Sequence, residues 1–202
     1  MVKDTNLYRG KVEIALKRNN KILKKSTHNA GLPDMALLFA KAITGNISPI
    51  DDLPRLLDIG YVVPGANDGA NSSDNGVWMS ILNSPVNIGG RQYRYDGKLD
   101  NWVGILTSTV YAADLNNPVI EDATQKIMDG VYILKARLCS YNKRGRKYLA
   151  EIEMNLDDIT EIREKTSAIF TWYTELLYAE PDSSDSLQSD VSNSANTTPV
   201  EP

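Results

Sequence analysis

The chain has 202 residues, of which 42% are hydrophobic and 24% charged, and it contains 13 glycines and 9 prolines. This length allows one large β domain or two small ones with a sizeable core, and the glycine and proline content suits a β protein with many turns. The net charge is −4, but 5 of the 26 acidic residues follow position 179, so residues 1–179 carry 22 basic and 21 acidic side chains. This near-neutral balance gives no electrostatic argument for a nucleic-acid-binding protein, and we do not expect nucleic acid as a partner.

The cysteine count and the hydropathy pattern exclude further classes. A single cysteine, Cys139, leaves no internal disulfide and no multi-cysteine metal site. The N-terminal residues are polar and charged, so we expect no signal peptide. The chain also lacks an apolar run of about 18 residues, so we expect no membrane span and no membrane partner.

The N-terminal region predicts a β-hairpin. Apolar and charged residues alternate over Tyr8–Lys17, which indicates a half-buried strand. Asn19 and Asn20 suit the following turn, because asparagine tolerates positive φ angles. The return strand is expected over Ile22–Thr27, with another turn at His28–Gly31.

The next segment predicts a helix from about Leu32 to Thr44. Pro33 stands in its first turn and Gly45 follows its end, which is the usual asymmetry of helix termini. Lys41 is the only charged residue after Asp34, and a helix that is apolar nearly all round is a buried one. We therefore expect this helix to be a plug packed against a sheet.

The middle of the chain predicts short strands joined by polar connections. The loop Pro64–Gly76 is long enough that it should be either mobile or ordered by a partner. Leu115–Asp129 is interpreted as an acidic, polar connection. The strands expected here are Leu56–Val63, Val77–Leu82, Arg91–Asp96 and Asn101–Ala113.

Gly130–Ser140 and Lys147–Asn155 predict a second hairpin around a turn at Asn142–Gly145. The first strand should direct one face to the core through Tyr132, Leu134, Ala136 and Leu138. The second should direct inward Tyr148, Ala150, Ile152 and Met154. The opposite faces then bring Lys135 and Arg137 against Glu151 and Glu153, each pair contributing roughly 0.2–1 kcal/mol.

A short helical connection at Leu156–Lys165 leads to the final strand, Ser167–Tyr178. Both faces of this strand are largely apolar, so burial of one face does not account for it. We expect the second face to be covered by another layer of the chain or by another subunit.

Together these elements predict a mainly β fold, an antiparallel β-sandwich or barrel with one buried α-helix and a short second helical segment. We expect a single β-rich domain at residues 1–179. The acidic, Ser-, Asp- and Asn-rich tail at residues 180–202 has too little apolar content to offset the entropy of ordering and is expected to be disordered.

Candidate chemical groups do not form a catalytic arrangement in the sequence. His28 is the only histidine and has no nucleophile or metal ligand beside it, so a hydrogen bond to nearby backbone is the favoured interpretation. Cys139 has basic neighbours at Lys135 and Arg137 that could lower its pKa, but an inert thiol is favoured. We expect no catalytic and no cofactor-binding residue, and no enzyme activity; titratable residues clustered in a deep pocket would favour an enzyme.

Two loops carry clustered polar groups. Asp68, Asn71 and Asp74 supply oxygen atoms that could bind a cation, but their spacing lacks the EF-hand pattern, so a solvated loop is favoured and no metal site is expected. The adjacent carboxylates Asp157 and Asp158 favour a helix N-terminus. The basic turn Lys143–Lys147 could contact nucleic acid or an acidic partner, but such turns are common on protein surfaces, so a surface turn is favoured.

Two parts of the chain resemble structural proteins of tailed bacteriophages. Thr27–Gly31 followed by Leu37–Asn46 resembles a small-residue turn and apolar helix of these proteins. The segments Tyr148–Asn155, Asp157–Lys165 and Ala168–Leu177 resemble the terminal strand, linker and aromatic closing strand of phage tail, collar and ring subunits.

The resemblance implies a virion structural protein, without enzyme activity, that forms a ring, collar or fibre-attachment layer near the portal and tail. Its expected partners are copies of itself and other virion proteins (portal, ring, tail or fibre subunits). Its expected location is the virion, assembled in the host bacterial cytoplasm. The residues expected to anchor the core or an interface are Trp102, Phe170, Trp172, Tyr173 and Leu177.

The alternative function is a receptor- or glycan-binding module, either an adhesin or a head decoration. This alternative predicts a monomer or trimer with an exposed platform of aromatic rings, whereas the ring or collar subunit predicts a higher-order assembly.

Overall fold

The computed structural model describes residues 8–18, 21–31, 33–64, 76–142, 145–164 and 166–176. The tail expected at residues 180–202 lies outside this part of the chain, as do Leu177 and most of the loop expected at Pro64–Gly76. The helices are α1 (Pro33–Ile43), α2 (Asn117–Met128), α3 (Leu156–Arg163) and the 3₁₀ helix η1 (Ala112–Asp114). The strands are β1 (Tyr8–Arg18), β2 (Lys21–Gly31), β3 (Leu56–Pro64), β4 (Gly76–Ser80), β5 (Val86–Asn87), β6 (Gly90–Asp96), β7 (Asn101–Tyr111), β8 (Leu134–Asn142), β9 (Gly145–Glu153) and β10 (Ser167–Leu176).

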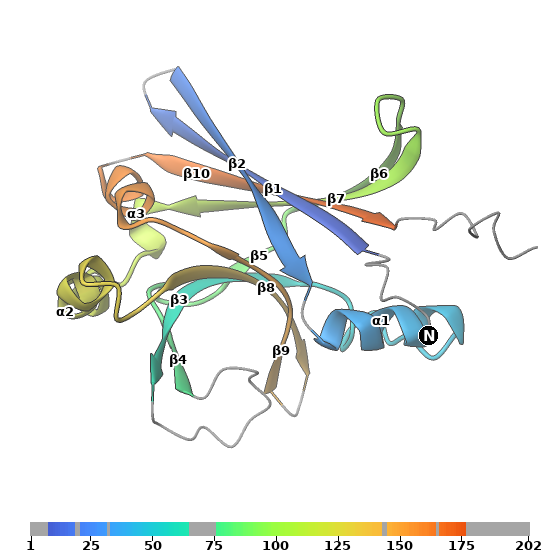
Figure 1. Ribbon diagram of the computed structural model, residues 1–202, viewed down its shortest axis with the longest axis horizontal. Coiled ribbons are helices and arrows are strands. Elements are labelled where there is room, and N and C mark those ends of the chain that lie inside the picture. Colours follow the sequence, from blue (N-terminus) through green and yellow to red (C-terminus); the bar gives the residue numbers. More distant parts are fainter. Residues whose placement is uncertain are drawn as a thin grey trace, which may run out of the picture.

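The strands form two antiparallel layers that face each other (Figure 1). The upper layer has the order β2-β1-β10-β7-β6 and the lower layer the order β4-β3-β8-β9. The layers are joined at one side, where Ala30 and Gly31 at the end of β2 pair with Glu151 and Ala150 of β9. A mainly β, antiparallel and sandwich-like fold is therefore confirmed.

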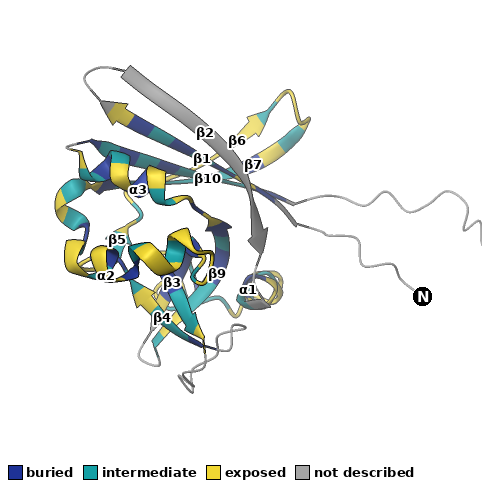
Figure 2. Ribbon diagram, turned by 60° about the vertical axis from the view of Figure 1, so that its left-hand side comes forward, coloured by how far each residue is buried: buried dark blue, intermediate teal, exposed yellow. Residues whose placement is uncertain are grey.

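The core lies between the two layers. Val12, Phe170 and Trp172 project from the upper layer, and Leu57 and Ile152 from the lower one, and all are almost completely buried. Helices α2 and α3 close one end of the space between the layers (Figure 2). They contribute the buried residues Ile120, Ala123, Ile159 and Ile162.

Helix α1 is not the buried plug that its composition predicts. Met35 and Leu38 are buried, but Leu37 is exposed and Ile43 is 87% exposed. The helix packs on one side against β9 and leaves its other side open (Figure 1). The apolar composition predicted burial on all sides of the helix. The prediction failed because the neighbouring strands cover only one side of it.

Two further local predictions were wrong. The turn expected at His28–Gly31 is part of β2, because the pairing with β1 continues to Asn29 and pairing with β9 follows immediately. The acidic connection expected at Leu115–Asp129 contains α2, which begins beside Pro118 and buries Ile120 and Ala123. Its mostly polar composition hid the two apolar positions that pack against the core.

The hairpin of β8 and β9 has the predicted register in its first half. Lys135 lies opposite Glu153 and Arg137 opposite Glu151, on one face. A bulge after Leu138 then shifts the register, so that Tyr148 pairs with Cys139 and leaves the core face. The prediction that Tyr148 points inward was wrong, because the bulge places Leu149 in the core instead.

The final strand, β10, lies in the middle of the upper layer between β1 and β7. Its core face carries Ala168, Phe170 and Trp172, which are fully buried by the chain itself. On the opposite face Ile169, Thr171 and Tyr173 are only half-buried. Both faces of this strand were expected to be covered. In the isolated chain the core face is completely covered, and the opposite face is partly covered.

Candidate functional site

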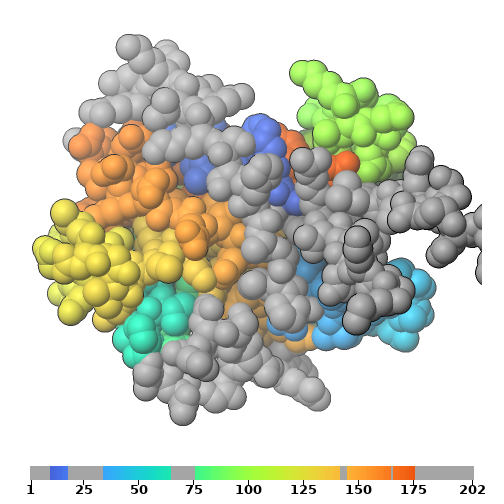
Figure 3. All heavy atoms as spheres, in the orientation of Figure 1, coloured from blue at the N-terminus to red at the C-terminus, as the bar shows by residue number. Residues whose placement is uncertain are grey.

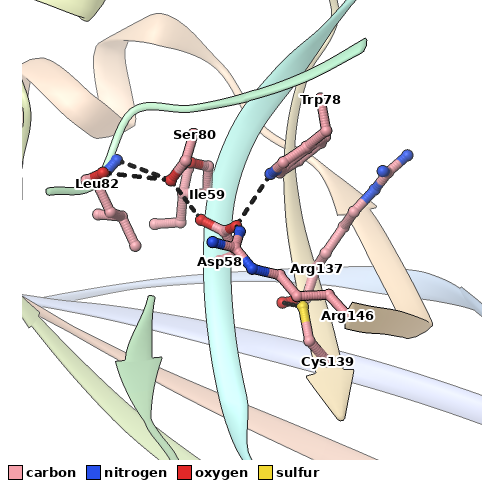
Figure 4. Close-up of polar contacts among 8 residues, drawn as sticks. All are labelled: Asp58, Ile59, Trp78, Ser80, Leu82, Arg137, Cys139 and Arg146. Atoms are coloured by element: carbon pink, nitrogen blue, oxygen red, sulfur yellow. Dashed lines mark hydrogen bonds and ion pairs between the residues drawn. The ribbon is translucent and has the colours of Figure 1, made fainter. Parts of the chain in front are cut away.

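A buried polar cluster lies on the outer face of the lower layer (Figure 4). The Asp58 side chain is fully buried and accepts hydrogen bonds from Trp78 Nε1 at 3.0 Å and Ser80 Oγ at 2.5 Å. The Arg146 guanidinium forms an ion pair with the same carboxylate at 2.5 Å. The three donors come from two different strands, so Asp58 ties β3 to both β4 and β9.

Arg137 extends this cluster through aromatic rings. Its guanidinium lies 4.1 Å from the centroid of the Trp78 ring and 4.5 Å from that of Tyr148, and it forms an ion pair with Glu151 at 3.1 Å. The bulge in β9 is what brings Tyr148 to this face. Burial raises the pKa of Tyr148, so this phenol stays neutral beside the buried Asp58 carboxylate.

Cys139 belongs to the same buried face. Burial is the main cause of the raised pKa of its thiol, and the negative charge of Asp58 raises this pKa further. The positive charges of Arg146 and Arg137 lower the pKa by smaller amounts. A thiol held in its neutral form is a poor nucleophile. This direction agrees with the favoured interpretation of an inert thiol and speaks against activation of the thiol by its basic neighbours.

A second candidate site is the hairpin of β6 and β7, which curves up and away from the lower layer at one end of the molecule (Figure 1). Figure 3 shows it in green as a knob that projects from the surface. Tyr93, Tyr95 and Trp102 lie together on one face of this hairpin and are 78%, 50% and 59% exposed. Trp102 lies with its ring centroid 5.4 Å from that of Tyr93 and 6.0 Å from that of Tyr95.

The turn of this hairpin is held by its own polar groups. The Tyr95 hydroxyl donates a hydrogen bond to the Asp100 carboxylate, and Asp100 has the positive φ angle of 52° that the turn requires. Asp96 accepts a hydrogen bond from the backbone N–H of Lys98 at 3.0 Å. The aromatic rings are therefore presented from a hairpin with internal support.

The concave side of the same hairpin forms a pocket of about 400 Å³ over the outer face of the upper layer. Its wall contains Lys11, whose ammonium lies 2.7 Å from Glu13, and Tyr173, whose hydroxyl donates to Glu13 at 3.1 Å. Burial, followed by this hydrogen bond, raises the pKa of Tyr173. Glu175 is buried beneath and accepts a hydrogen bond from Asn101 at 3.2 Å.

A third site is a cleft of about 420 Å³ between the end of α2 and the start of β8. Its apolar lining includes Ile127, Tyr132 and Ile133, and the acidic residues Glu153 and Asp157 also line it. At the α3 terminus beside it, Asp158 accepts a hydrogen bond from the backbone N–H of Asn155 at 3.4 Å, as its place at a helix start suggested.

The expected anchor residues occupy three different environments. Phe170 and Trp172 are in the core, Tyr173 lies on the wall of the pocket, and Trp102 is exposed on the hairpin. The structure therefore does not bring them together in one site. Leu177 lies outside the described residues, as do the loop residues Asp68, Asn71 and Asp74, the turn residues Lys143 and Arg144, and the side chain of His28.

Several residues of these sites were given no functional role from the sequence. Tyr93 and Tyr95 were placed on a strand without a role, although their i, i+2 spacing puts both rings on one face. Trp102 faces Tyr95 across the hairpin, which follows only from the register. Asp58 and Arg146 carried no signal, because 88 positions separate them in the chain.

Comparison with known proteins gives no identification, because no protein family model, no curated protein and no solved structure matches this chain. Within the described residues, no three or more His, Cys, Asp or Glu side chains come together as a metal-binding group. No helix of the same part of the chain is long and apolar enough to cross a membrane.

Proposed function

We propose that this protein is a structural subunit that assembles with copies of itself and with neighbouring proteins, in the setting that the sequence resemblance implies: a ring, collar or fibre-attachment layer of a tailed-phage virion. The observation that carries the proposal is the group of three exposed aromatic rings on the projecting β6–β7 hairpin. This placement supports contact with another macromolecule.

The physical reason for expecting a contact here is that aromatic surface exposed to water is unfavourable. Contiguous exposed apolar side chains on a folded protein mark interaction sites, and tyrosine and tryptophan are enriched where such sites become buried. Tyr93, Tyr95 and Trp102 form such a group at the edge of the upper layer, where β6 is the last strand of the sheet order. The edge strand also carries backbone groups that a neighbouring chain could pair with.

The test is the mass of the purified protein in solution, measured by sedimentation over a range of concentrations. We expect the wild type to form a higher-order assembly and the double variant Tyr93→Ser/Trp102→Ser to lose it. The matched control is Tyr141→Ser, which removes a similarly exposed ring from β8 and should leave the assembly intact. A wild type that remains monomeric at all concentrations would contradict self-assembly.

The same exposed rings favour a second candidate, the glycan-binding module. Aromatic faces can pack against the apolar face of a sugar ring, and the hairpin presents three of them. A glycan-binding screen with the wild type and the Trp102→Ser variant separates the two functions. Binding by a monomer or trimer, lost in Trp102→Ser, would favour this candidate over the structural subunit.

A further inference from the structure

The pocket on the concave side of the β6–β7 hairpin has the size and the lining of a small-molecule site. Its volume is about 400 Å³, within the range of pockets that bind small ligands. Among the residues that the structure describes, the charged ones in its lining are Lys11, Glu13, Arg94, Asp96, Lys98 and Glu175. Three of these are positive and three negative, so this lining is neutral as a whole but carries separated charges of both signs.

Part of this lining is already satisfied within the protein. Lys11 Nζ lies 2.7 Å from Glu13 Oε1, and the Tyr173 hydroxyl donates to Glu13 Oε2 at 3.1 Å, so both oxygens of Glu13 have partners. The hydrogen bond to Glu13 is the largest cause that raises the pKa of Lys11, and the charge of Asp96 raises this pKa further. Lys11 thus interacts with two carboxylates, and these groups need no ligand.

Glu175 is different, because it is a buried carboxylate at the pocket. It is only 8% exposed, and it accepts a hydrogen bond from the neutral side-chain amide of Asn101 at 3.2 Å. It takes part in no ion pair within the described residues. A buried charge without a counter-charge is unfavourable. An ammonium group placed in the pocket beside Glu175 would offset this cost.

The hairpin wall of the pocket carries two cations, Arg94 and Lys98. Arg94 lies opposite Val103, and Val103 lies opposite Glu175, so the backbones of Arg94 and Glu175 are two strand spacings, about 10 Å, apart. Arg94 and Lys98 are exposed, and neither forms an ion pair in the part of the chain that the structure describes. A guanidinium group binds a carboxylate through two parallel hydrogen bonds, which suits this wall to a carboxylate.

These separated charges discriminate between classes of ligand. An anion would be attracted by Arg94 and Lys98 but repelled by Glu175, and a cation would meet the reverse. A neutral sugar would leave the charges of both walls without a counter-charge. A ligand with one ammonium and one carboxylate group satisfies both walls. The lining also contains Leu99 and Val103, which offer contact to an apolar group.

We propose that this pocket binds a small zwitterion with the chemistry of a free amino acid that has an apolar side chain. The ammonium group pairs with Glu175, and the carboxylate pairs with Arg94 and Lys98. The apolar side chain packs against Leu99 and Val103. This site goes beyond the proposed function in assembly and does not depend on it, because it uses the concave side of the hairpin and not the exposed rings.

The test compares three probes that share one apolar side chain, by isothermal titration calorimetry. Leucine carries both charges, leucinamide only the ammonium group, and isocaproate only the carboxylate. We expect the dissociation constant of leucine to be about tenfold or more below that of either analogue, because each analogue loses one ion pair. Equal binding of the three probes, or no saturable binding of leucine, would overturn the proposal.

Two charge-neutralising variants give a signature that a merely structural role would not. Glu175→Gln keeps an acceptor for Asn101 and removes the negative charge, so it should weaken leucine about tenfold and tighten isocaproate. Arg94→Gln should weaken leucine and tighten leucinamide. The matched control is Glu153→Gln on β9, outside this pocket, which should change none of the three affinities. A Glu175→Gln variant that weakens all three probes alike would overturn the proposed pairing.

Amide NMR of the unchanged protein locates the ligand if a variant fails to fold. Leucine should shift the amide signals of Gly10 and Val103, which line the pocket, and leave that of Ile152 in the lower layer unchanged. Shifts that spare Gly10 and Val103 would overturn the site. Galactose that shifts these two signals and competes with leucine would overturn the zwitterion in favour of a neutral sugar.

Discussion

Two aromatic regions on the same face of the upper layer meet opposite environments. Phe170 and Trp172 on β10 are fully buried, whereas Tyr93 and Trp102 on the β6–β7 hairpin are mostly exposed. The register connects them, because Trp172 pairs with Leu106 of β7 and Trp102 lies four positions before Leu106 on the same face. The lower layer covers the first region, and the hairpin carries the second away from it (Figure 2).

Whether these rings are buried or exposed depends on the position of their strand in the sheet order, and not on aromatic content. β10 stands between β1 and β7 over the lower layer, so its rings serve stability. The hairpin ends the sheet order, so its rings are available to another molecule. Matched substitutions at buried and exposed positions test this dependence on position.

The largest effect is expected from the two tryptophans. Replacement of Trp172 by Ala should lower the free energy of unfolding by about 3–5 kcal/mol, because it removes a large, fully buried ring. Replacement of Trp102 by Ala should change it by about 0.5 kcal/mol or less in the monomer. Chemical denaturation at low protein concentration measures both. Equal losses in the two variants would break the comparison.

The next effect is expected from two carboxylates. Asp58→Asn removes a buried charge that accepts hydrogen bonds from Trp78 and Ser80 and pairs with Arg146, and should cost about 3 kcal/mol. Asp100→Asn changes an exposed turn residue at positive φ, a conformation that asparagine tolerates, and should be nearly neutral. Thermal unfolding of both variants checks the difference. A neutral Asp58→Asn would show that the buried cluster does not support the lower layer.

A smaller change in the free energy of unfolding is expected from two glutamates of β9. Glu151 accepts hydrogen bonds from Lys135 at 2.9 Å and from the buried Arg137 at 3.1 Å, so Glu151→Gln should cost about 1.5 kcal/mol. Glu153 is exposed on the same strand, and Glu153→Gln should stay within about 0.5 kcal/mol. Urea denaturation compares the two. A larger loss for Glu153→Gln would refute the register as the source of this stability.

The smallest effect concerns pH and the attachment of α1. The hydrogen bond from Lys41, followed by that from the Ser48 backbone, holds the pKa of Asp52 below its ordinary value. A lowered folded-state pKa means that the contribution is complete above the unfolded value of about 3.9 and is lost as the pH falls through the folded value. Between pH 5 and pH 2 the wild type should therefore lose more stability than Asp52→Asn.

The control for this prediction is the neighbouring carboxylate. Asp51 is less buried than Asp52 and accepts a hydrogen bond from the Ser48 hydroxyl. Asp51→Asn leaves the Lys41–Asp52 ion pair in place, so this variant should keep the wild-type pH dependence. Unfolding followed at both pH values checks the three proteins. An Asp52→Asn variant with the full wild-type loss would assign the acid sensitivity to other groups.

The sequence predicted the parts of the fold that depend on local pattern. Alternation located β1, β8 and β9, and charge alternation gave the correct pairing of Lys135 and Arg137 with the glutamates of β9. The β-branched and aromatic residues of β10 correctly indicated a strand. Of the two covered faces that were expected, the chain itself covers the one with Phe170 and Trp172 completely.

The parts that failed depend on what packs from elsewhere. The half-exposed α1 and the buried outer face around Asp58 are set by layers far apart in the chain, and no local period reports them. The bulge that turns Tyr148 toward Arg137 shifts the alternation by one residue, which a regular pattern cannot predict. Exposure of Trp102 likewise follows from the curvature of the hairpin, which no pattern in its residues predicts.

Hydrogen–deuterium exchange of the wild-type protein at increasing concentration tests whether the β6–β7 hairpin is the contact between copies. We expect the backbone amides of residues 90–102 to become protected as the concentration rises, while the amides of β10 are equally protected throughout. Protection that does not change with concentration, or that increases only at other segments such as α1, would contradict the claim that the aromatic hairpin is the contact between copies.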